Sequence, residues 1–215
     1  MTWTVGFDLD MTLIDSRRGV ARAIDVVAAD YGLELRGSEL AERLGPPLAM
    51  ILADAGAPEA LIPELVARYR ELYPEVIAEV PAMAGADAAI DAVADAGGRL
   101  LVVTGKYQPH AELHVGHLGW PVDIVAGELW SEGKAAALRE HGARIFVGDH
   151  AGDMRGARAA GAYGVGVVTG PCTAEELWAA GADVVLADLT TFPEWFAGFD
   201  GVSDAPARPC ARTRP

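Results

Sequence analysis

Lysine and cysteine are both scarce in this chain of 215 residues. Only two lysines occur, Lys106 and Lys134, so arginine supplies the other positive side-chain charges. The two cysteines, Cys172 and Cys210, stand far apart and lack the spacing of a metal site. This usage argues against a disulfide scaffold and favours a reducing compartment. We therefore expect a cytoplasmic protein, and each lysine needs an explanation.

Long apolar runs and net positive charge are also missing. Apolar residues make up 51% of the chain, but no run approaches the roughly 20 uncharged residues of a membrane span, and we expect no signal peptide. The formal net charge of −14 disfavours nucleic acid and anionic membranes as partners, and no basic patch interrupts it. The sequence favours a small-molecule partner and leaves both a monomer and a homodimer open.

Short apolar runs alternate with helical patterns in most of the chain. A strand is predicted at 3–8, and from residue 81 onward helices are predicted at 86–96, 109–118, 133–141, 153–160 and 173–180, with a short one near Phe196. The strands between them are predicted at 99–103, 122–125, 144–147, 163–168 and 183–186. This alternation predicts an α/β fold with a Rossmann-like parallel sheet, helices on both faces and ligands at the carboxyl ends of the strands.

Residues 16–80 carry helical patterns only. Apolar residues recur at helical spacing in 17–31 and 59–79, and shorter helices are expected at 38–43 and near Pro46. We expect a small all-helical cap over 16–80, inserted into a catalytic core of 1–15 and 81–199. Residues 200–215 are rich in Pro, Ala and Arg without periodicity, which predicts a flexible tail.

Acidic side chains follow two of the predicted strands. Asp8, Asp10 and Thr12 follow the first strand, and Asp149 and Asp153 follow the strand at 144–147. Carboxylates that meet at one sheet edge repel each other unless a proton or a cation lies between them, and Mg²⁺ prefers such ligands. The alternative readings are an ordinary acidic turn for the first segment and a helix cap for Asp153.

Donor groups are expected at the same edge. Thr104 and Gly105 follow the strand at 99–103 and offer a hydroxyl and a backbone N–H to an oxyanion, although a helix N-cap is the commoner role of such a threonine. Lys134 stands at a predicted helix start, where its ammonium could neutralise a phosphoryl group; an exposed lysine at the end of a helix is the alternative. We expect Lys106 to be solvated.

These four segments together resemble the four motifs of the haloacid dehalogenase superfamily, in order and over about residues 3–195. The matching residues are the Asp-x-Asp-x-Thr of 8–12, Thr104, Lys134 and the Gly-Asp-x-x-x-Asp of 148–153. The helical insert resembles the small cap of that superfamily, and the phosphoglycolate-phosphatase-like branch is the most similar. Met11 departs from the glycine that is common there.

The resemblance implies a Mg²⁺-dependent phosphatase that acts on a small phosphorylated metabolite through an aspartyl-phosphate. Asp8 would be the nucleophile, and Asp10 the proton shuttle whose backbone carbonyl helps to hold Mg²⁺. Asp149 would complete the metal shell together with Asp8, and Asp153 would orient it directly or through water. The phosphate oxygens would be stabilised by Thr12, Thr104, Gly105 and Lys134.

The same residues bear on four alternative functions. A dehalogenase would not need the acidic set around a metal, and a phosphonatase would need a cap lysine that 16–80 lacks. A sugar phosphomutase stays open, because only exclusion of water by the cap separates it from a phosphatase. A non-catalytic regulatory protein that keeps the fold is the remaining alternative.

Substrate contacts are the least defined part of the site. Arg43 and the turn at 45–47 are candidates by resemblance, and His150 is a candidate because it adjoins Asp149. His110, His114 and His117 recur at helical spacing, but a solvated helix face explains them better than a transition-metal site. Gly164 and Gly166 lack the third glycine of a dinucleotide fingerprint, so their small size is read as a packing feature.

Overall fold

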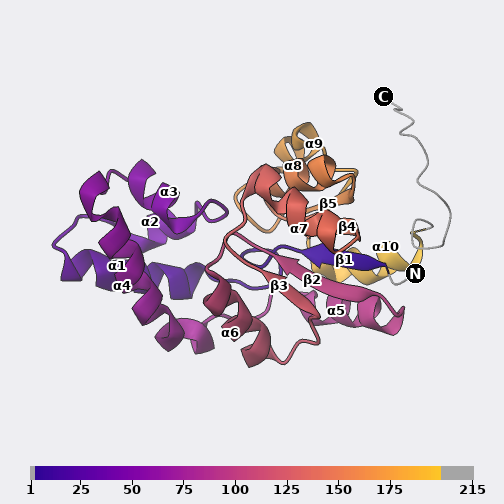
Figure 1. Ribbon diagram of the computed structural model, residues 1–215, viewed down its shortest axis with the longest axis horizontal. Helices are drawn as coiled ribbons and strands as arrows, with labels where there is room; N and C mark the ends of the chain where they lie inside the picture. The colour runs from indigo at the N-terminus through magenta and orange to yellow at the C-terminus, as the bar shows by residue number, and fades with distance from the viewer. Residues whose placement is uncertain (1–2, 200–215) are drawn as a thin grey trace.

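The computed structural model describes residues 3–199 and shows two lobes (Figure 1). The larger lobe is built on a parallel sheet with the strand order β3-β2-β1-β4-β5-β6. The strands of these described residues are β1 (Thr4–Phe7), β2 (Arg99–Val103), β3 (Ile124–Ala126), β4 (Ala143–Gly148), β5 (Tyr163–Val167) and β6 (Val184–Leu186). The predicted α/β, Rossmann-like fold class is therefore confirmed.

Helices cover both faces of the sheet. One face packs against α5 (Ala86–Asp95), α6 (Gln108–Leu118) and α10 (Phe192–Ala197), and the other against α7 (Lys134–Glu140) and α8 (Ala151–Ala160). The short helix α9 (Ala174–Ala180) follows β5, η3 (Ser131–Gly133) precedes α7, and η4 (Leu189–Thr191) precedes α10. Because both faces are covered, β1 is buried throughout and needs no polar face.

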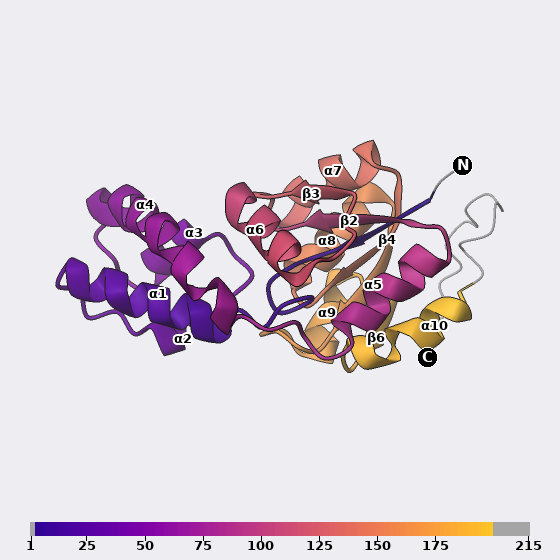
Figure 2. The ribbon, with the colours of Figure 1, turned by 90° about the horizontal axis from the view of Figure 1, so that it is seen from below.

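The smaller lobe, which we call the helical lobe, contains the helical elements from Arg17 to Glu79. They are α1 (Arg17–Asp30), α2 (Gly37–Ala41), α3 (Leu48–Asp54), η1 (Glu59–Leu61), α4 (Ile62–Leu72) and η2 (Tyr73–Glu79). The helical lobe has an apolar core of its own around Ile24, Leu65 and Tyr73. Figures 1 and 2 both show it beside the carboxyl ends of the strands.

Two connecting segments join the lobes and pair with each other. The amide of Asp15 donates to the Pro81 carbonyl at 2.9 Å, and the amide of Met83 donates to the Leu13 carbonyl at 2.8 Å. The chain thus leaves the core after β1 and returns to α5 through one short ladder. This pairing keeps the helical lobe next to the end of β1.

The helix predicted as continuous over 59–79 is instead three pieces. The α-helical piece ends at Leu72, and a 3₁₀ segment follows from Tyr73. Pro74 has no N–H to donate to the carbonyl of Arg70, four residues earlier, so the α-helical ladder stops there. The amphipathic spacing holds on both sides of the break, but Pro74 ends the α-helix.

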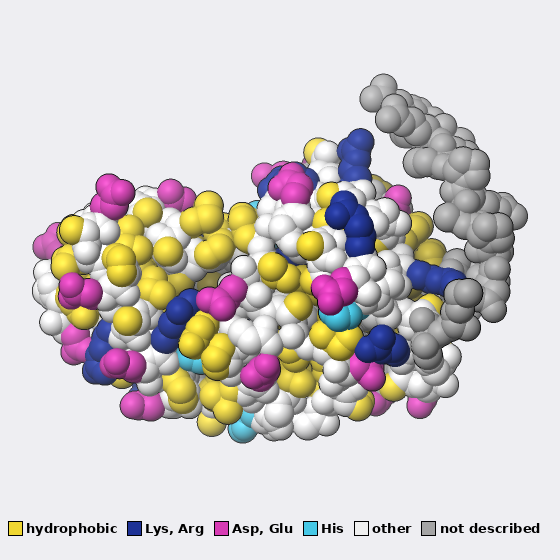
Figure 3. Space-filling view, in the orientation of Figure 1, with side chains coloured by type: hydrophobic (Ala, Val, Ile, Leu, Met, Phe, Trp, Pro, Cys, Tyr) yellow, Lys and Arg dark blue, Asp and Glu magenta, His cyan; other side chains and the backbone are white. Residues whose placement is uncertain are grey.

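The helices and the surface of the described residues have two further features. Among the described residues no helix is both long and apolar enough to cross a membrane. Acidic side chains are spread over both lobes on the face of the molecule that Figure 3 shows. The tail predicted over 200–215, including Cys210, lies outside the described residues.

Candidate active site

Three neighbouring strands deliver the predicted site residues to one edge of the sheet. Asp8 follows β1, Thr104 follows β2 and Asp149 follows β4, and these strands are adjacent in the order β2-β1-β4. The amide of Asp8 donates to the carbonyl of Val147 at 2.8 Å, which ties the first acidic turn to β4. The carboxyl ends of parallel strands meet at one edge, so the segments converge although they are distant in sequence.

Asp8, Asp149 and Asp153 form a buried group of carboxylates. One oxygen of each lies within 4.8 Å of one oxygen of each of the others. Lys134 Nζ, also buried, lies 2.8 Å from Asp8 Oδ1 and 2.6 Å from Asp153 Oδ1. Lys134, which was predicted to neutralise a phosphoryl group, is thus buried and in contact with Asp8, and the alternative of an exposed lysine at the end of a helix is wrong.

The charges in this group do not balance. Burial raises the pKa of Asp8 to about 7, with the charge of Asp153 adding to the rise and Lys134 opposing it. Burial also raises the pKa of Asp149 well above its usual range, as do the charges of Asp153 and Asp8. One ammonium faces three carboxylates, so the group favours a further cation.

Asp149 shows where such a cation is needed. Thr12 Oγ1 donates to Asp149 Oδ1 at 2.7 Å, whereas the buried Oδ2 has no hydrogen-bond partner among the described residues. Hard oxygen ligands of this kind suit Mg²⁺ and similar divalent ions. The donor set and the orphaned oxygen therefore fit a divalent metal.

The turn after β1 takes a strained backbone conformation. Met11 has a φ of 61°, in the left-handed region that favours glycine, and its carbonyl accepts a hydrogen bond from Thr169 Oγ1 at 2.5 Å. This conformation explains why a glycine would suit the position. The tertiary contact with Thr169 stabilises the turn that carries Asp10 and Thr12.

Asp10 is held by a residue that we expected to be solvated. Lys106 Nζ lies 2.6 Å from Asp10 Oδ1, and the lysine side chain is only 6% exposed. Burial raises the pKa of Asp10, but the charge and hydrogen bond of Lys106 outweigh it and the net pKa is lowered. The prediction for Lys106 was wrong because a lysine after a strand gives no sign of which lobe covers it.

Thr104 and Gly105 lie beside this ion pair. The hydroxyl of Thr104 is buried and accepts a hydrogen bond from the Lys106 amide at 3.2 Å, so its own proton is available for donation. Gly105 lines the space between the lobes. Both positions are compatible with the predicted contacts to phosphate oxygens.

The two predicted substrate contacts differ in their surroundings. His150 caps α8: its Nδ1 accepts from the Gly152 amide at 2.9 Å, and its own amide donates to Asp153 Oδ2 at 3.0 Å. Asp153 thus serves the helix cap and the carboxylate group at once. Arg43 pairs with Asp54 at 3.6 Å and is 51% exposed.

The histidines of α6 are not on a solvated face. His110 and His114 are buried, with His110 stacked on Tyr73 at 4.7 Å between ring centroids and His114 Nε2 lying 3.1 Å from Tyr73 Oη. Only His117 is exposed. The solvated-face interpretation is wrong for two of the three residues because the helical lobe packs on α6.

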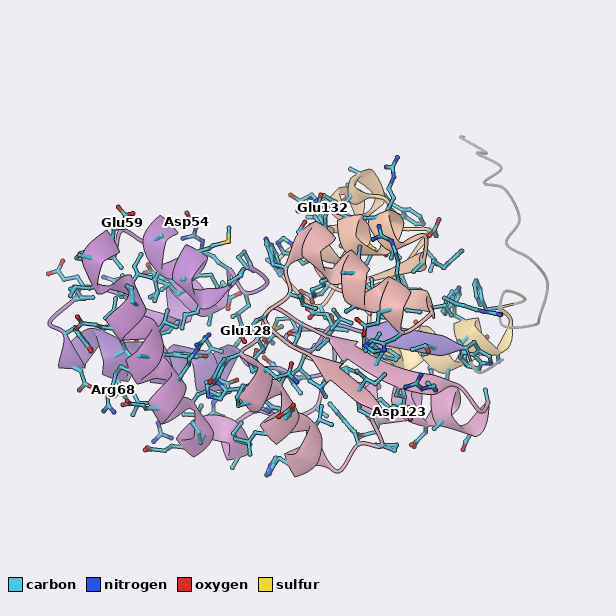
Figure 4. The ribbon with its side chains drawn as sticks, viewed as in Figure 1. Asp54, Glu59, Arg68, Asp123, Glu128 and Glu132 are labelled. Carbon is cyan, nitrogen blue, oxygen red and sulfur yellow. The ribbon has the colours of Figure 1, made fainter. Side chains whose placement is uncertain are left out.

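A pocket of about 180 Å³ lies between the lobes and includes Asp10 in its lining. The core contributes Gly105, Lys106 and Tyr107, and the helical lobe contributes the loop at 44–49 and Arg70. Arg70 reaches across the junction: its Nη2 lies 2.8 Å from Glu128 Oε1, and its guanidinium lies 3.7 Å from the centre of the Tyr107 ring. Glu128 is labelled at this junction in Figure 4.

Arg70 and Lys106 both line this pocket. The sequence analysis did not single out Arg70 and predicted that Lys106 is solvated. The scarcity of lysine was a usable signal for Lys106, and nothing marked Arg70 among the other arginines. A wider, shallow hollow of about 550 Å³ on α1, lined by Arg18, Asp25 and Glu79 among others, contains none of the predicted site residues. The pocket that includes Asp10 is therefore the one that adjoins the predicted site residues.

The fold and the acidic edge define a hydrolase of the haloacid dehalogenase type. The family model described as haloacid dehalogenase-like hydrolase matches residues 5–167, so the chain belongs to this family. A phosphoglycolate phosphatase of Xylella fastidiosa is 31% identical over 181 residues, covering 74% of this chain and 76% of the relative. One of Caulobacter vibrioides is 28% identical over 212 residues and covers 89% of each chain. The family match and these relatives together identify the chain as a phosphatase, that is, a phosphoric monoester hydrolase, of the phosphoglycolate-phosphatase-like branch.

Solved structures agree with the fold. A predicted phosphatase from Clostridium acetobutylicum superposes with a TM-score of 0.80 at 22% identity, covering 93% of this chain and all of the other. A haloacid dehalogenase-like hydrolase from Streptococcus pneumoniae gives a TM-score of 0.79 at 22% identity, covering 91% and 98%. At this identity the likeness concerns the fold alone.

Proposed function

We propose that this phosphatase uses Mg²⁺ to hydrolyse a small phosphorylated metabolite, phosphoglycolate-like or sugar-phosphate-like, through an aspartyl-phosphate on Asp8. The observation that carries the proposal is the buried contact of Asp8 with Lys134, beside Asp149 and Asp153. Asp10 lies two residues further along the same turn, at the pocket between the lobes. These contacts support Asp8 as the nucleophile and Lys134 as the positive charge beside it, and the charge of Asp10 also acts on Asp8.

The first half of the reaction transfers the phosphoryl group to the protein. An oxygen of Asp8 would form a bond to phosphorus while the bond from phosphorus to the ester oxygen breaks. Asp10 would have to take up a proton for this step, against the lowering of its pKa by Lys106, and would give that proton to the leaving alkoxide. Lys134, Thr104 and the amide of Gly105 would stabilise the phosphoryl oxygens by charge and hydrogen bonds.

The second half regenerates the nucleophile. Asp10, now a carboxylate, would take a proton from a water that attacks phosphorus, and the bond between phosphorus and Asp8 breaks to release phosphate. Asp8, Asp149, Asp153 and the backbone carbonyl of Asp10 are the groups that would hold Mg²⁺. When bound, the ion supplies positive charge that offsets the phosphate oxygens and the carboxylates.

The helical lobe would act as the cap of the site. Its loop at 44–49 lines the pocket, and a Cβ on Gly45 would lie only 2.8 Å from the His150 ring, so the loop approaches the core closely. Gly45 also has a φ of 134°, which a side chain would strain. Closure of this lobe would exclude bulk water from the transfer step.

The test is phosphate release from a panel of phosphorylated metabolites that includes phosphoglycolate and hexose phosphates. We expect release that requires Mg²⁺, stops with excess chelator and is lost in Asp8→Asn. Asp95→Asn, an exposed carboxylate on α5, is the matched control and should keep full activity. Release that persists in folded Asp8→Asn would mean that the nucleophile is another residue, and isomer formation without release would make the protein a mutase.

A further inference from the structure

The turn between Asp10 and Thr12 has an unfavourable backbone conformation at its centre. Met11 has a φ of 61°, where a side chain brings its Cβ close to the following carbonyl oxygen. Such a conformation persists only where the surrounding structure holds it in place. The contacts of Met11 therefore show what fixes this turn.

Both lobes contact Met11. Its side chain is only 3% exposed and belongs to the apolar core of the helical lobe, together with Ile24 and Tyr73. Its carbonyl accepts a hydrogen bond at 2.5 Å from Thr169 Oγ1, which is 158 positions away in the sequence. Thr169 thus fixes the Met11 peptide from outside the turn.

The segment that carries Thr169 follows β5 and is itself anchored. The amide of Val168 donates to the carbonyl of Leu186 at 3.1 Å, next to the pairing of β5 with β6. On the other side of Thr169, a Cβ added to Gly170 would overlap Asp149 Oδ2, so the backbone lies directly against the acidic edge. Thr169 is therefore presented to the turn from the sheet.

The Met11 peptide lies between two side chains that need fixed directions. Asp10 Oδ1 lies 2.6 Å from Lys106 Nζ, and Thr12 Oγ1 donates to Asp149 Oδ1 at 2.7 Å. Relaxation of Met11 to a negative φ would turn Asp10 relative to Thr12. The hydrogen bond to the Met11 carbonyl thus favours the conformation in which Asp10 lines the pocket.

We propose that Thr169 is a positioning residue for the phosphatase reaction: acting through the Met11 carbonyl, its hydroxyl holds Asp10 where Asp10 can protonate the leaving ester oxygen. The proposal rests on the proposed function, in which Asp10 is that acid, and adds to it a residue from the segment after β5. Loss of the hydroxyl should therefore slow the hydrolysis of those substrates whose leaving group needs a proton.

The test compares kcat/KM for two kinds of phosphate in Thr169→Val, with Mg²⁺ present. The alkyl ester of the metabolite panel that the wild-type protein hydrolyses fastest has an alkoxide leaving group, which needs a proton; acetyl phosphate releases a carboxylate, which does not. Because kcat/KM covers only the steps up to phosphoryl transfer, the later use of Asp10 as a base does not enter. We expect kcat/KM to fall about 5- to 20-fold for the alkyl ester and less than about 2-fold for acetyl phosphate.

Three further variants serve as controls. Thr169→Ser keeps a hydroxyl and should keep the wild-type ratio of the two kcat/KM values. Thr4→Val removes a comparable hydrogen bond, from Thr4 Oγ1 to the His141 carbonyl at 2.8 Å at the other end of β1, and should not change the ratio. In Met11→Gly the left-handed φ has no steric cost, so Thr169→Val should change the ratio by less than about 2-fold in that background.

The ratio does not depend on how much of a variant is folded, so each result decides the role of Thr169. Equal losses on both substrates in Thr169→Val, or an equal change of the ratio in Thr4→Val, would overturn the proposal. Hydrolysis of acetyl phosphate alone by the wild-type protein would overturn it too, because no alkoxide would then be protonated. Activity that survives excess chelator or Asp8→Asn, with the expected change of the ratio in Thr169→Val, would refute the proposed metal or nucleophile and leave the role of Thr169 intact.

Discussion

His110 donates a hydrogen bond from Nε2 to the backbone carbonyl of Arg70, across the junction of the two lobes, at 3.0 Å. That carbonyl lacks its usual helical partner because residue 74 is a proline without an N–H. A carbonyl can only accept, so the His110 ring must carry its proton on Nε2. A break in a helix of one lobe is thus completed by a side chain of the other.

This relationship predicts a non-additive pair of substitutions. His110→Phe keeps a ring against Tyr73 but removes the donor, and we expect a loss of about 1 kcal/mol in the free energy of unfolding by urea. In Pro74→Ala the new N–H can serve the Arg70 carbonyl, so His110→Phe should cost less in that background. An equal cost in both backgrounds would show that the hydrogen bond is not the relevant interaction.

Replacement of Lys134 should affect stability as well as activity. Lys134→Met leaves Asp8 and Asp153 without their common cation in a buried site, which we expect to cost about 3 to 5 kcal/mol in urea unfolding without metal. Mg²⁺ should restore part of that loss. Arg68→Met, which breaks an exposed pair with Asp30, is the control and should leave the free energy of unfolding nearly unchanged. Similar costs for both variants would contradict the picture of an unbalanced buried site.

Removal of one carboxylate should stabilise the metal-free protein. The pKa of Asp149 is raised in the folded state, so its ionisation near pH 7 opposes folding unless a cation is bound. Asp149→Asn should therefore raise the Tm in chelator and abolish the further rise that Mg²⁺ produces in the wild-type protein. A Tm that falls in chelator would contradict the destabilising effect of the Asp149 charge, and a Mg²⁺-induced rise as large as that of the control Asp95→Asn would exclude Asp149 as a metal ligand.

His114 predicts the pH dependence of stability on the acid side. Burial, together with the charge of Lys106, lowers the pKa of His114 to about 3, whereas an unfolded histidine titrates near about 6.5. As the pH falls below that value, the unfolded chain binds a proton that the folded chain does not, and stability is lost by up to about 1.4 kcal/mol per pH unit. His114→Gln should lose less stability than wild type between pH 7 and pH 5, measured by urea unfolding. Exposed His117→Gln should follow the wild-type slope, and identical slopes for all three proteins would refute the prediction.

The positions of the acidic residues along the chain could be predicted because they depend on local patterns. Apolar runs bounded by helical stretches located β1, β2 and β4, and Asp8, Thr104 and Asp149 follow these strands directly. Parallel strands bring their carboxyl ends to one edge, so the meeting of the three residues followed from fold class. Lys134 was found because lysine is so rare in this chain.

The surroundings of Lys106, Arg70 and the α6 histidines could not be predicted in the same way. Lys106 and Asp10 are 96 positions apart, and His110 and Arg70 are 40 apart. Helical spacing places His110 and His114 on one face of α6 but does not tell whether that face meets water or the helical lobe. The proline that ends α4 was visible, but the partner of the freed carbonyl was not.

The sequence by itself determined the order of strands and helices, the edge at which the carboxylates meet and the family to which the chain belongs, because periodicity and short motifs are local properties. Only the tertiary structure decided which cation faces which carboxylate. Lys134 contacts Asp8 inside the larger lobe, whereas Lys106, which pairs with Asp10, is covered by the helical lobe through Tyr73. Such pairing depends on contacts between residues far apart in the chain, which no local pattern encodes.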